Sequence, residues 1–262
     1  MKDVIAILGA GNMGTAFYKG MSQHLMKVRI NVCDRNREKL EELDAEHAYT
    51  DPAKAIIDTD VVLLAVKPQS AQELLAPLSR DLTDRLVISI MAGIGLASLQ
   101  KMTRSATVIR AMPNLPARVG RGLTGWIASP GVTPKQRAFA RELFLAVGQE
   151  IELENEALMD SLTPLSGSGP AYFYLLAELL AAKALKEGFT ETQAALIARE
   201  TLVGSALLLD SGAETPSHLS VAVASKGGTT EAALRSLEED NVPTLFSNAI
   251  DNAIARSREL NR

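Results

Sequence analysis

The residues from Val4 to Thr15, VIAILGAGNMGT, constrain the fold of this chain more than any other stretch. An apolar run with several β-branched residues leads into Gly9, Gly11 and Gly14, which have the G-x-G-x-x-G spacing, and a helix-compatible segment follows. In such a strand–turn–helix unit the first glycine permits the turn, the second lets a pyrophosphate approach, and the third lets the helix pack on the strand. The N–H groups of the first helical turn then face the diphosphate. The stretch therefore predicts a dinucleotide site in preference to a structural glycine turn.

An acidic residue stands where such a unit contacts the ribose of the cofactor. Asp34 lies 20 residues after Gly14, at the end of the apolar stretch 28–33. A carboxylate there accepts hydrogen bonds from the ribose 2'-hydroxyl and repels a 2'-phosphate, which favours NADH. Arg35, with Arg37 nearby, can instead bind a 2'-phosphate, which favours NADPH. The sequence leaves this choice open, together with the simpler interpretation that all three residues are solvated turn charges.

The composition excludes several classes of protein. The chain has 262 residues, of which 47% are hydrophobic and 22% charged, as is ordinary for a globular protein. Its formal net charge of −4, without a basic run or an aromatic stripe, argues against a nucleic-acid partner. The absence of a long apolar run or a charged leader predicts a cytoplasmic protein without a membrane anchor. Cys33 cannot form an internal disulfide, and its apolar neighbours predict a buried strand residue in preference to a reactive thiol.

Strand and helix signals alternate up to about residue 155 and predict an α/β fold with a doubly wound parallel sheet. The expected strands after the first are 28–33, 60–66, 86–90, 107–111, 123–128 and 149–153, with helices at 37–43 and 134–146. Beyond residue 155 strand signals vanish, and the pattern suits helices at 164–188, 190–209, 217–224, 230–238 and 242–260. We therefore expect a dinucleotide-binding domain over 1–160 and an all-α domain over 161–262.

Two further segments are expected at the carboxyl edge of the sheet, where ligands bind in such folds. The third strand ends at Val66, Lys67 and Pro68, so the lysine can approach the cofactor, although a solvated loop lysine explains it as well. The fifth strand leads into MPNLP, in which two prolines stiffen the chain around Asn114. Asn114 then either faces the nicotinamide or substrate, or bonds its own backbone in a rigid turn.

The segment 171–185, AYFYLLAELLAAKAL, is apolar almost all round a helix and must be buried on several sides. In a domain of about 100 residues the simplest burial is against a second copy of the chain, which predicts an obligate homodimer. A central helix in a monomeric bundle is the alternative.

A second anion site is expected in the helical domain. Gly227, Gly228, Thr229 and Thr230 precede a helix pattern, so backbone N–H groups and hydroxyls point outward at its N-terminus. A helix cap alone explains the threonines, but the paired glycines also let a small carboxylate come close.

Five motifs occur in order along the chain: ILGAGNMG at 7–14, AVKPQ at 65–69, IRAMPN at 109–114, LSGSGPAY at 165–172 and SKGGTTEAAL at 225–234. With these motifs the chain resembles the pyrroline-5-carboxylate reductase family over essentially its whole length. The resemblance implies an N-terminal Rossmann-like domain, a helical dimerisation domain, and reduction of a cyclic imine to L-proline with NADPH or NADH. It also implies a site formed between the subunits of a dimer, with assembly of dimers into higher homo-oligomers in many members.

The resemblance also implies roles for individual residues. The GGTT turn binds the substrate carboxylate in this family, so Gly227, Gly228, Thr229 and Thr230 are expected to bind substrate, with Thr230 the catalytic hydroxyl nearest the imine. The residues assigned to the cofactor are Gly9, Gly11, Asn12, Met13, Gly14, Asp34, Arg35, Val66, Lys67, Pro68 and Asn114. No metal is expected. Hydride transfer to a protonated imine requires alignment more than a strong acid or base, which explains why no histidine or paired carboxylate stands out.

The chain departs from the family pattern at several positions. Leu115 stands where the family usually has threonine, Lys226 often reads as proline, and Asp34 replaces a common serine or asparagine, which puts the NADPH preference in doubt. A β-hydroxyacid dehydrogenase or related imine reductase is the enzymatic alternative. Those dehydrogenases place a catalytic lysine on the interdomain helix, whereas residues 166–172 contain none. A nucleotide-sensing binding protein is the non-enzymatic alternative, against which the GGTT turn argues.

Overall fold

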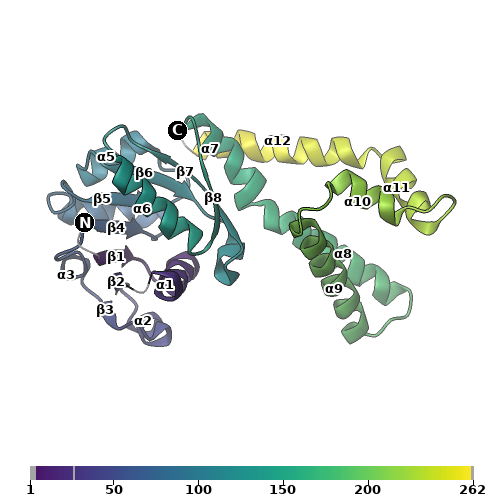
Figure 1. Ribbon diagram of the computed structural model, residues 1–262, viewed down its shortest axis with the longest axis horizontal. Helices are drawn as coiled ribbons and strands as arrows, with labels where there is room; N and C mark the ends of the chain where they lie inside the picture. Colours follow the sequence, from purple (N-terminus) through teal and green to yellow (C-terminus); the bar gives the residue numbers. More distant parts are fainter. Residues whose placement is uncertain (1–3, 26, 261–262) are drawn as a thin grey trace. The chain divides into compact units, whose positions relative to one another are not determined.

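The computed structural model describes residues 4–25 and 27–260. They form two compact units, which are described separately (Figure 1). The first extends to Ser168 and also takes in the chain from Ile254 onward, and the second covers Gly169–Ala253. The units divide inside the segment expected as one helix over 164–188. The predicted functional division at residue 160 stays a prediction.

The first unit is built on an eight-stranded sheet of order β3-β2-β1-β4-β5-β6-β7-β8. Its strands are β1 (Val4–Leu8), β2 (Arg29–Cys33), β3 (His47–Tyr49), β4 (Val61–Leu64), β5 (Leu86–Ser89), β6 (Val108–Met112), β7 (Gly122–Ala128) and β8 (Gly148–Glu152). All neighbouring strands are parallel except β6 and β7. The strand order reverses between β1 and β4, which creates the crevice where dinucleotides bind in this kind of sheet.

Helices cover both faces of this sheet, and the central strands are accordingly apolar on both sides. Ile5 and Ile7 of β1 pack in a cluster with α1 (Asn12–His24), α2 (Arg37–Leu43) and α6 (Pro134–Leu145). Ala6 and Leu8 pack on the other face, with α3 (Pro52–Ala55), α4 (Ala71–Leu78) and α5 (Leu96–Thr103). The unit is completed by η1 (Pro68–Ser70), η2 (Leu115–Val119), α7 (Ala157–Leu162) and η3 (Thr163–Gly167). The doubly wound α/β fold expected from the sequence is confirmed.

The alternation of strands and helices had predicted a parallel sheet. The sheet contains one antiparallel pair, β6 and β7. Only residues 113–121 join β6 to β7, and they hold the short turn η2. A parallel connection needs a crossover of a dozen or more residues, so this strand returns antiparallel. Strand β3 was also missed, because three residues at the sheet edge carry little periodic signal.

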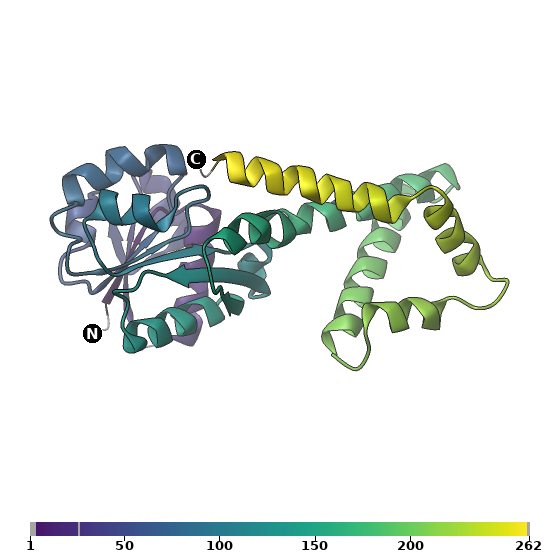
Figure 2. The ribbon, with the colours of Figure 1, turned by 90° about the horizontal axis from the view of Figure 1, so that it is seen from above.

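The second unit, residues 169–253, contains helices and no strands, as Figure 2 shows. They are α8 (Gly169–Lys186), α9 (Glu191–Asp210), α10 (Pro216–Val223), α11 (Thr229–Glu239) and most of α12 (Val242–Leu260). One expected helix differs by several residues: instead of starting at 164, α8 begins at Gly169, after a π-helical turn over 163–167. Pro170 occupies its first turn, where a missing N–H costs nothing.

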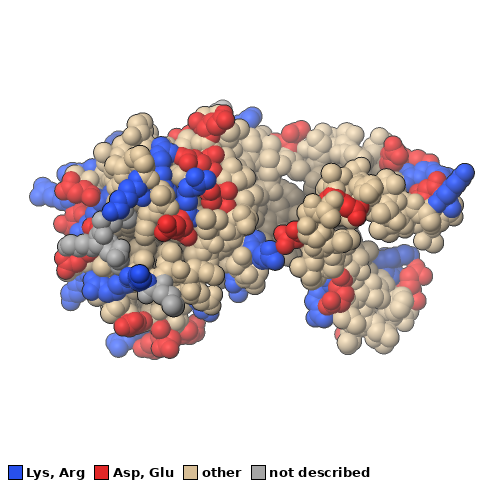
Figure 3. All heavy atoms as spheres, viewed as in Figure 1, with Lys and Arg blue, Asp and Glu red and all other residues tan. Residues whose placement is uncertain are grey.

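Large apolar side chains of the second unit are exposed in the single chain. On α8, seven of them are between 46% and 56% exposed: Phe173, Tyr174, Leu175, Leu176, Leu179, Leu180 and Leu185. Figure 3 shows wide areas without charged side chains over these helices, whereas charges cover the visible face of the first unit. A surface this apolar is typical of an interface with another protein chain.

Candidate functional site

The three motif glycines differ in the space around their Cα atoms. Gly9 has φ +113°, and a Cβ there would lie 2.5 Å from the backbone oxygen of Ala65. At Gly14 a Cβ would lie 1.9 Å from the oxygen of Gly9, so any side chain would push α1 off the loop. At Gly11 a Cβ would meet nothing within 4 Å. The turn is thus closed on the protein side and open at Gly11, where a bound pyrophosphate would need the space.

Helix α1 begins directly at this opening. Gly11 is its N-cap and offers no side chain to cap the helix, so its first N–H groups are left for a ligand. Asn12, the first helical residue, is exposed, and Met13 is partly buried against the core. The residues present therefore fit a dinucleotide diphosphate.

The end of β4 lies against the same loop. The N–H of Ala65 donates to the oxygen of Leu8 at 2.8 Å, and Val66 Cγ1 would be 3.1 Å from a Cβ on Gly9. Lys67 follows as the exposed N-cap of η1, with Pro68 in the first turn. The fold thus brings together two motifs that are more than 50 residues apart, at the crevice between β1 and β4.

Asp34 also contacts the glycine loop. Its Oδ2 accepts a hydrogen bond from the N–H of Ala10 at 2.8 Å, and its Oδ1 accepts one from the N–H of Asn36 at 2.9 Å. The ammonium of Lys39 lies 3.8 Å from Oδ2, and the carboxylate is only 12% exposed.

The two arginines after β2 differ in their surroundings. Arg37 pairs with Glu41 one turn further along α2, with Nε 3.1 Å from Oε1. Arg35 is exposed just before that helix, which Asn36 caps by accepting the N–H of Glu38.

Asn114 is fixed by both sides of its amide. Its Oδ1 accepts the N–H of Leu123 at 2.9 Å, and its Nδ2 donates to the backbone oxygen and hydroxyl of Ser166 at 3.3 and 3.2 Å. The side chain therefore joins the MPN segment to the start of β7 and to the LSGSG segment. This contact connects two of the five motifs over 52 residues of sequence.

The GGTT turn lies in the second unit, at the start of α11. Gly228 is the N-cap, and the helix begins at Thr229, one residue earlier than predicted. The N–H of Gly227 donates to Glu231, and that of Gly228 donates to the oxygen of Ser225 at 2.9 Å. The backbone donors at the open helix end therefore include those of Thr229 and Thr230.

Comparisons with known proteins agree on one family. The family model described as pyrroline-5-carboxylate reductase dimerisation matches residues 156–260, and one described as NADP oxidoreductase, coenzyme F420-dependent, matches residues 4–93. A pyrroline-5-carboxylate reductase of Vibrio alginolyticus is 36% identical, covering 98% of this chain and 97% of that protein. The chain belongs to the pyrroline-5-carboxylate reductase family.

Solved structures agree with this assignment. A pyrroline-5-carboxylate reductase from Coxiella burnetii superposes with a TM-score of 0.91 at 33% identity, with 98% of each chain covered. The pyrroline carboxylate reductase of Plasmodium falciparum, solved with NADP bound, has the same fold, with a TM-score of 0.87 at 24% identity and 98% of each chain covered.

The activity of this reductase family was predicted correctly from the sequence. The chain is an NAD(P)H-dependent oxidoreductase acting on a CH–NH group, and it reduces 1-pyrroline-5-carboxylate to L-proline in proline biosynthesis. The match to a dimerisation domain accounts for the exposed apolar helices of the second unit, because the reductase is a homo-oligomer.

One partly buried ion pair of this reductase was not predicted from the sequence. Arg110, 5% exposed on β6, donates to Glu156 Oε1 at 2.8 Å, and the same oxygen accepts the N–H of Leu96 at 2.8 Å. Glu156 thereby caps α5 from 60 residues away. The position of Arg110 inside an apolar strand was the available signal, since a buried arginine requires a partner.

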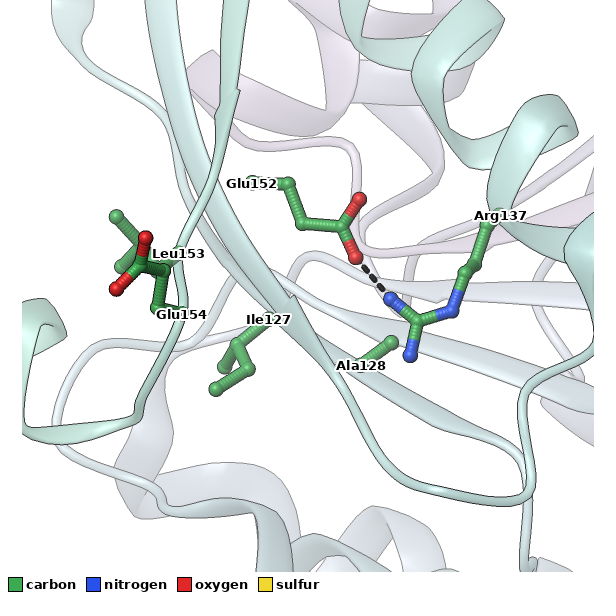
Figure 4. A pocket seen from close by; sticks show the side chains of 6 residues that line it. All are labelled: Ile127, Ala128, Arg137, Glu152, Leu153 and Glu154. Atoms are coloured by element: carbon green, nitrogen blue, oxygen red, sulfur yellow. Dashed lines mark hydrogen bonds and ion pairs between the residues drawn. The ribbon is translucent and has the colours of Figure 1, made fainter.

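Other features of the reductase lie apart from these residues. A pocket at the ends of β7 and β8 is lined by Ile127, Ala128, Arg137, Glu152, Leu153 and Glu154, with Arg137 and Glu152 paired (Figure 4). Within residues 4–25 and 27–260 no group of His, Cys, Asp and Glu could hold a metal ion. No helix in that part of the chain is long and apolar enough to cross a membrane. Cys33 is buried, as predicted.

Proposed function

We propose that the glycine loop and the ends of the neighbouring strands hold the cofactor of this reductase. Gly9, Gly11 and Gly14 shape the diphosphate site, with Asn12 and Met13 in the first turn of α1. The observation that carries this proposal is the contrast between Gly11, which is open, and the two glycines on which a Cβ would collide with backbone. Val66, Lys67 and Pro68 form the adjoining wall of the crevice, because β4 ends against the loop.

Asn114 takes part in this site as a residue that holds other groups in place. Its amide oxygen and nitrogen already bond Leu123 and Ser166, so it fixes the segment beyond β6 on which the nicotinamide end would lie. In this proposal the Asn114 side chain positions the segment and does not itself bind the nicotinamide.

The substrate carboxylate binds at the start of α11 in this proposal. The N–H groups of Thr229 and Thr230 supply donors, and the helix dipole favours a negative charge. Gly227 and Gly228 contribute by their lack of side chains, since φ at Gly227 is +74° and a Cβ on Gly228 would lie 2.4 Å from Ser225 Oγ. Thr230 provides the hydroxyl that orients the imine.

The bound nicotinamide supplies the hydride, and the chain supplies alignment. A protonated cyclic imine is already electrophilic, so holding its carbon in line with the donor provides most of the acceleration. The side chains at the two proposed sites accordingly include no paired carboxylates or histidine that would transfer a proton.

The proposal favours NADPH over NADH, because Arg35 is exposed at the end of β2 whereas Arg37 is paired with Glu41. We also place the working enzyme as a homodimer in the cytoplasm, with further assembly of dimers. The apolar α8 supports the dimer, and a single buried cysteine suits a reducing compartment.

The test is turnover of the purified full-length protein. It is mixed with 1-pyrroline-5-carboxylate, and oxidation of NADPH and NADH is followed in parallel by loss of absorbance. Rapid oxidation of NADPH, with slower oxidation of NADH, is expected. Two results together would overturn the proposal. Neither cofactor would be oxidised with this imine, and the protein would instead oxidise either cofactor with another imine, or oxidise a 3-hydroxyacid in the reverse direction.

A further inference from the structure

The carboxylate of Asp34 bridges the end of β2 and the glycine loop. Two consecutive hydrogen bonds join these segments: the N–H of Gly9 donates to the oxygen of Cys33 at 2.7 Å, and the N–H of Ala10 donates to Asp34 Oδ2 at 2.8 Å. The second oxygen of the carboxylate accepts the N–H of Asn36, the N-cap of α2. One side chain thus sets the loop and the adenosine side of the crevice relative to each other.

The bond from Ala10 has no substitute in the sheet. Ala10 is 5% exposed and follows β1, so its N–H points at Asp34 where water has little access. A buried N–H without an acceptor is costly, and a conformational change of the loop would be the way to relieve it. The glycines on either side make such a change easy, because they tolerate many backbone conformations.

The charge of Asp34 is already compensated without a cofactor. Two N–H groups bond its oxygens, and the ammonium of Lys39 lies 3.8 Å away. A carboxylate that protein N–H groups and an ammonium stabilise in this way repels a nearby phosphate less than a carboxylate without such partners. Its position therefore suits a role that does not depend on whether the ribose carries a 2'-hydroxyl or a 2'-phosphate.

We propose that Asp34 is a positioning residue that holds the glycine loop in its binding conformation for NADPH and NADH alike, instead of selecting between them. This inference rests on the proposed cofactor site. It separates two functions at the end of β2, since Arg35 contacts the 2'-phosphate and Asp34 holds Ala10.

The experiment measures binding of NADPH and of NADH to the protein without substrate, by the fluorescence of the reduced nicotinamide. Asp34→Ala is expected to raise both dissociation constants about tenfold, so that their ratio changes by less than about twofold. Asp34→Asn, which keeps one acceptor oxygen, is expected to raise both by a smaller factor. The matched control Arg35→Ala should raise the constant for NADPH alone.

Hydrogen exchange of the unliganded protein gives a second readout that needs no cofactor. The amide of Ala10 should exchange faster in both Asp34 variants than in the wild type and in Arg35→Ala. This measurement, together with a wild-type circular dichroism spectrum, separates a freed loop from a failure to fold.

Four results would overturn the inference. Tighter NADPH binding with weaker NADH binding in Asp34→Asn would show that the carboxylate selects the cofactor. Unchanged binding of both cofactors, or unchanged exchange at Ala10, would show that the bond does not hold the loop. A wild-type protein that binds neither cofactor would overturn the proposed cofactor site and the inference with it.

Discussion

Replacing Glu156 tests how the long-range ion pair stabilises the first unit. The variant Glu156→Ala removes the acceptor for the N–H of Leu96 and the carboxylate that pairs with Arg110. A hydrogen bond to a charged group contributes about 1.5–3 kcal/mol, and the Glu156 side chain is 36% exposed, so we expect a combined loss of about 2 kcal/mol. For a unit of this size such a loss corresponds to a fall in Tm of about 4–8 °C.

The assay is thermal and urea unfolding at one fixed protomer concentration, because stability of an oligomer depends on concentration. The matched control is Glu154→Ala, two residues away and exposed, for which a change within about 0.5 kcal/mol is expected. Glu156→Gln keeps one acceptor oxygen and should fall between the two. A Tm for Glu156→Ala within about 1 °C of wild type would refute the reasoning.

Three further predictions concern other parts of the chain. Burial, reinforced by the charges of Asp34 and Asp51, raises the pKa of the Cys33 thiol from 9.0 to about 12, so at pH 8 alkylation should be slow in the native protein and fast after unfolding. Equal alkylation rates in the native and unfolded protein would contradict this expectation. Because folding keeps the thiol neutral, the contribution of Cys33 to stability should decline as pH rises from 9.0 toward 12. Thr124 is fully buried, and its Oγ1 has no hydrogen-bond partner among the described residues. Thr124→Val should therefore raise the free energy of unfolding, measured with urea, by up to about 1 kcal/mol. A lower free energy of unfolding would show that the hydroxyl has a partner. Lys226→Ala should raise the KM for the imine carboxylate a few-fold through loss of attraction, and an unchanged KM would exclude that role.

Much of the fold could be predicted because local signals and the final structure agree. The glycine spacing at 9–14, the apolar strands and the change to helical periodicity after residue 155 were sufficient for the architecture, and the five ordered motifs were sufficient for the family. The antiparallel β7 and the π-helical turn before α8 were missed, because strand direction and helix type depend on connections and packing that periodicity does not report.

The candidate site was predicted in outline but not in its internal contacts. Sequence reasoning identified Asp34 and Asn114 by residue type and position, yet their acceptors and donors are satisfied by Ala10, Leu123 and Ser166. Such pairings join residues far apart in sequence, so only the folded chain shows that both side chains hold neighbouring segments in place.

The most direct test of the account is the turnover of Thr230→Ala with 1-pyrroline-5-carboxylate and NADPH, measured beside Thr230→Ser. If the hydroxyl at the start of α11 orients the imine, kcat should fall roughly ten- to hundredfold in the alanine variant, about 1.4–2.7 kcal/mol of transition-state stabilisation. The serine variant, which keeps the hydroxyl, should recover most of that loss. Wild-type turnover in Thr230→Ala would contradict the account.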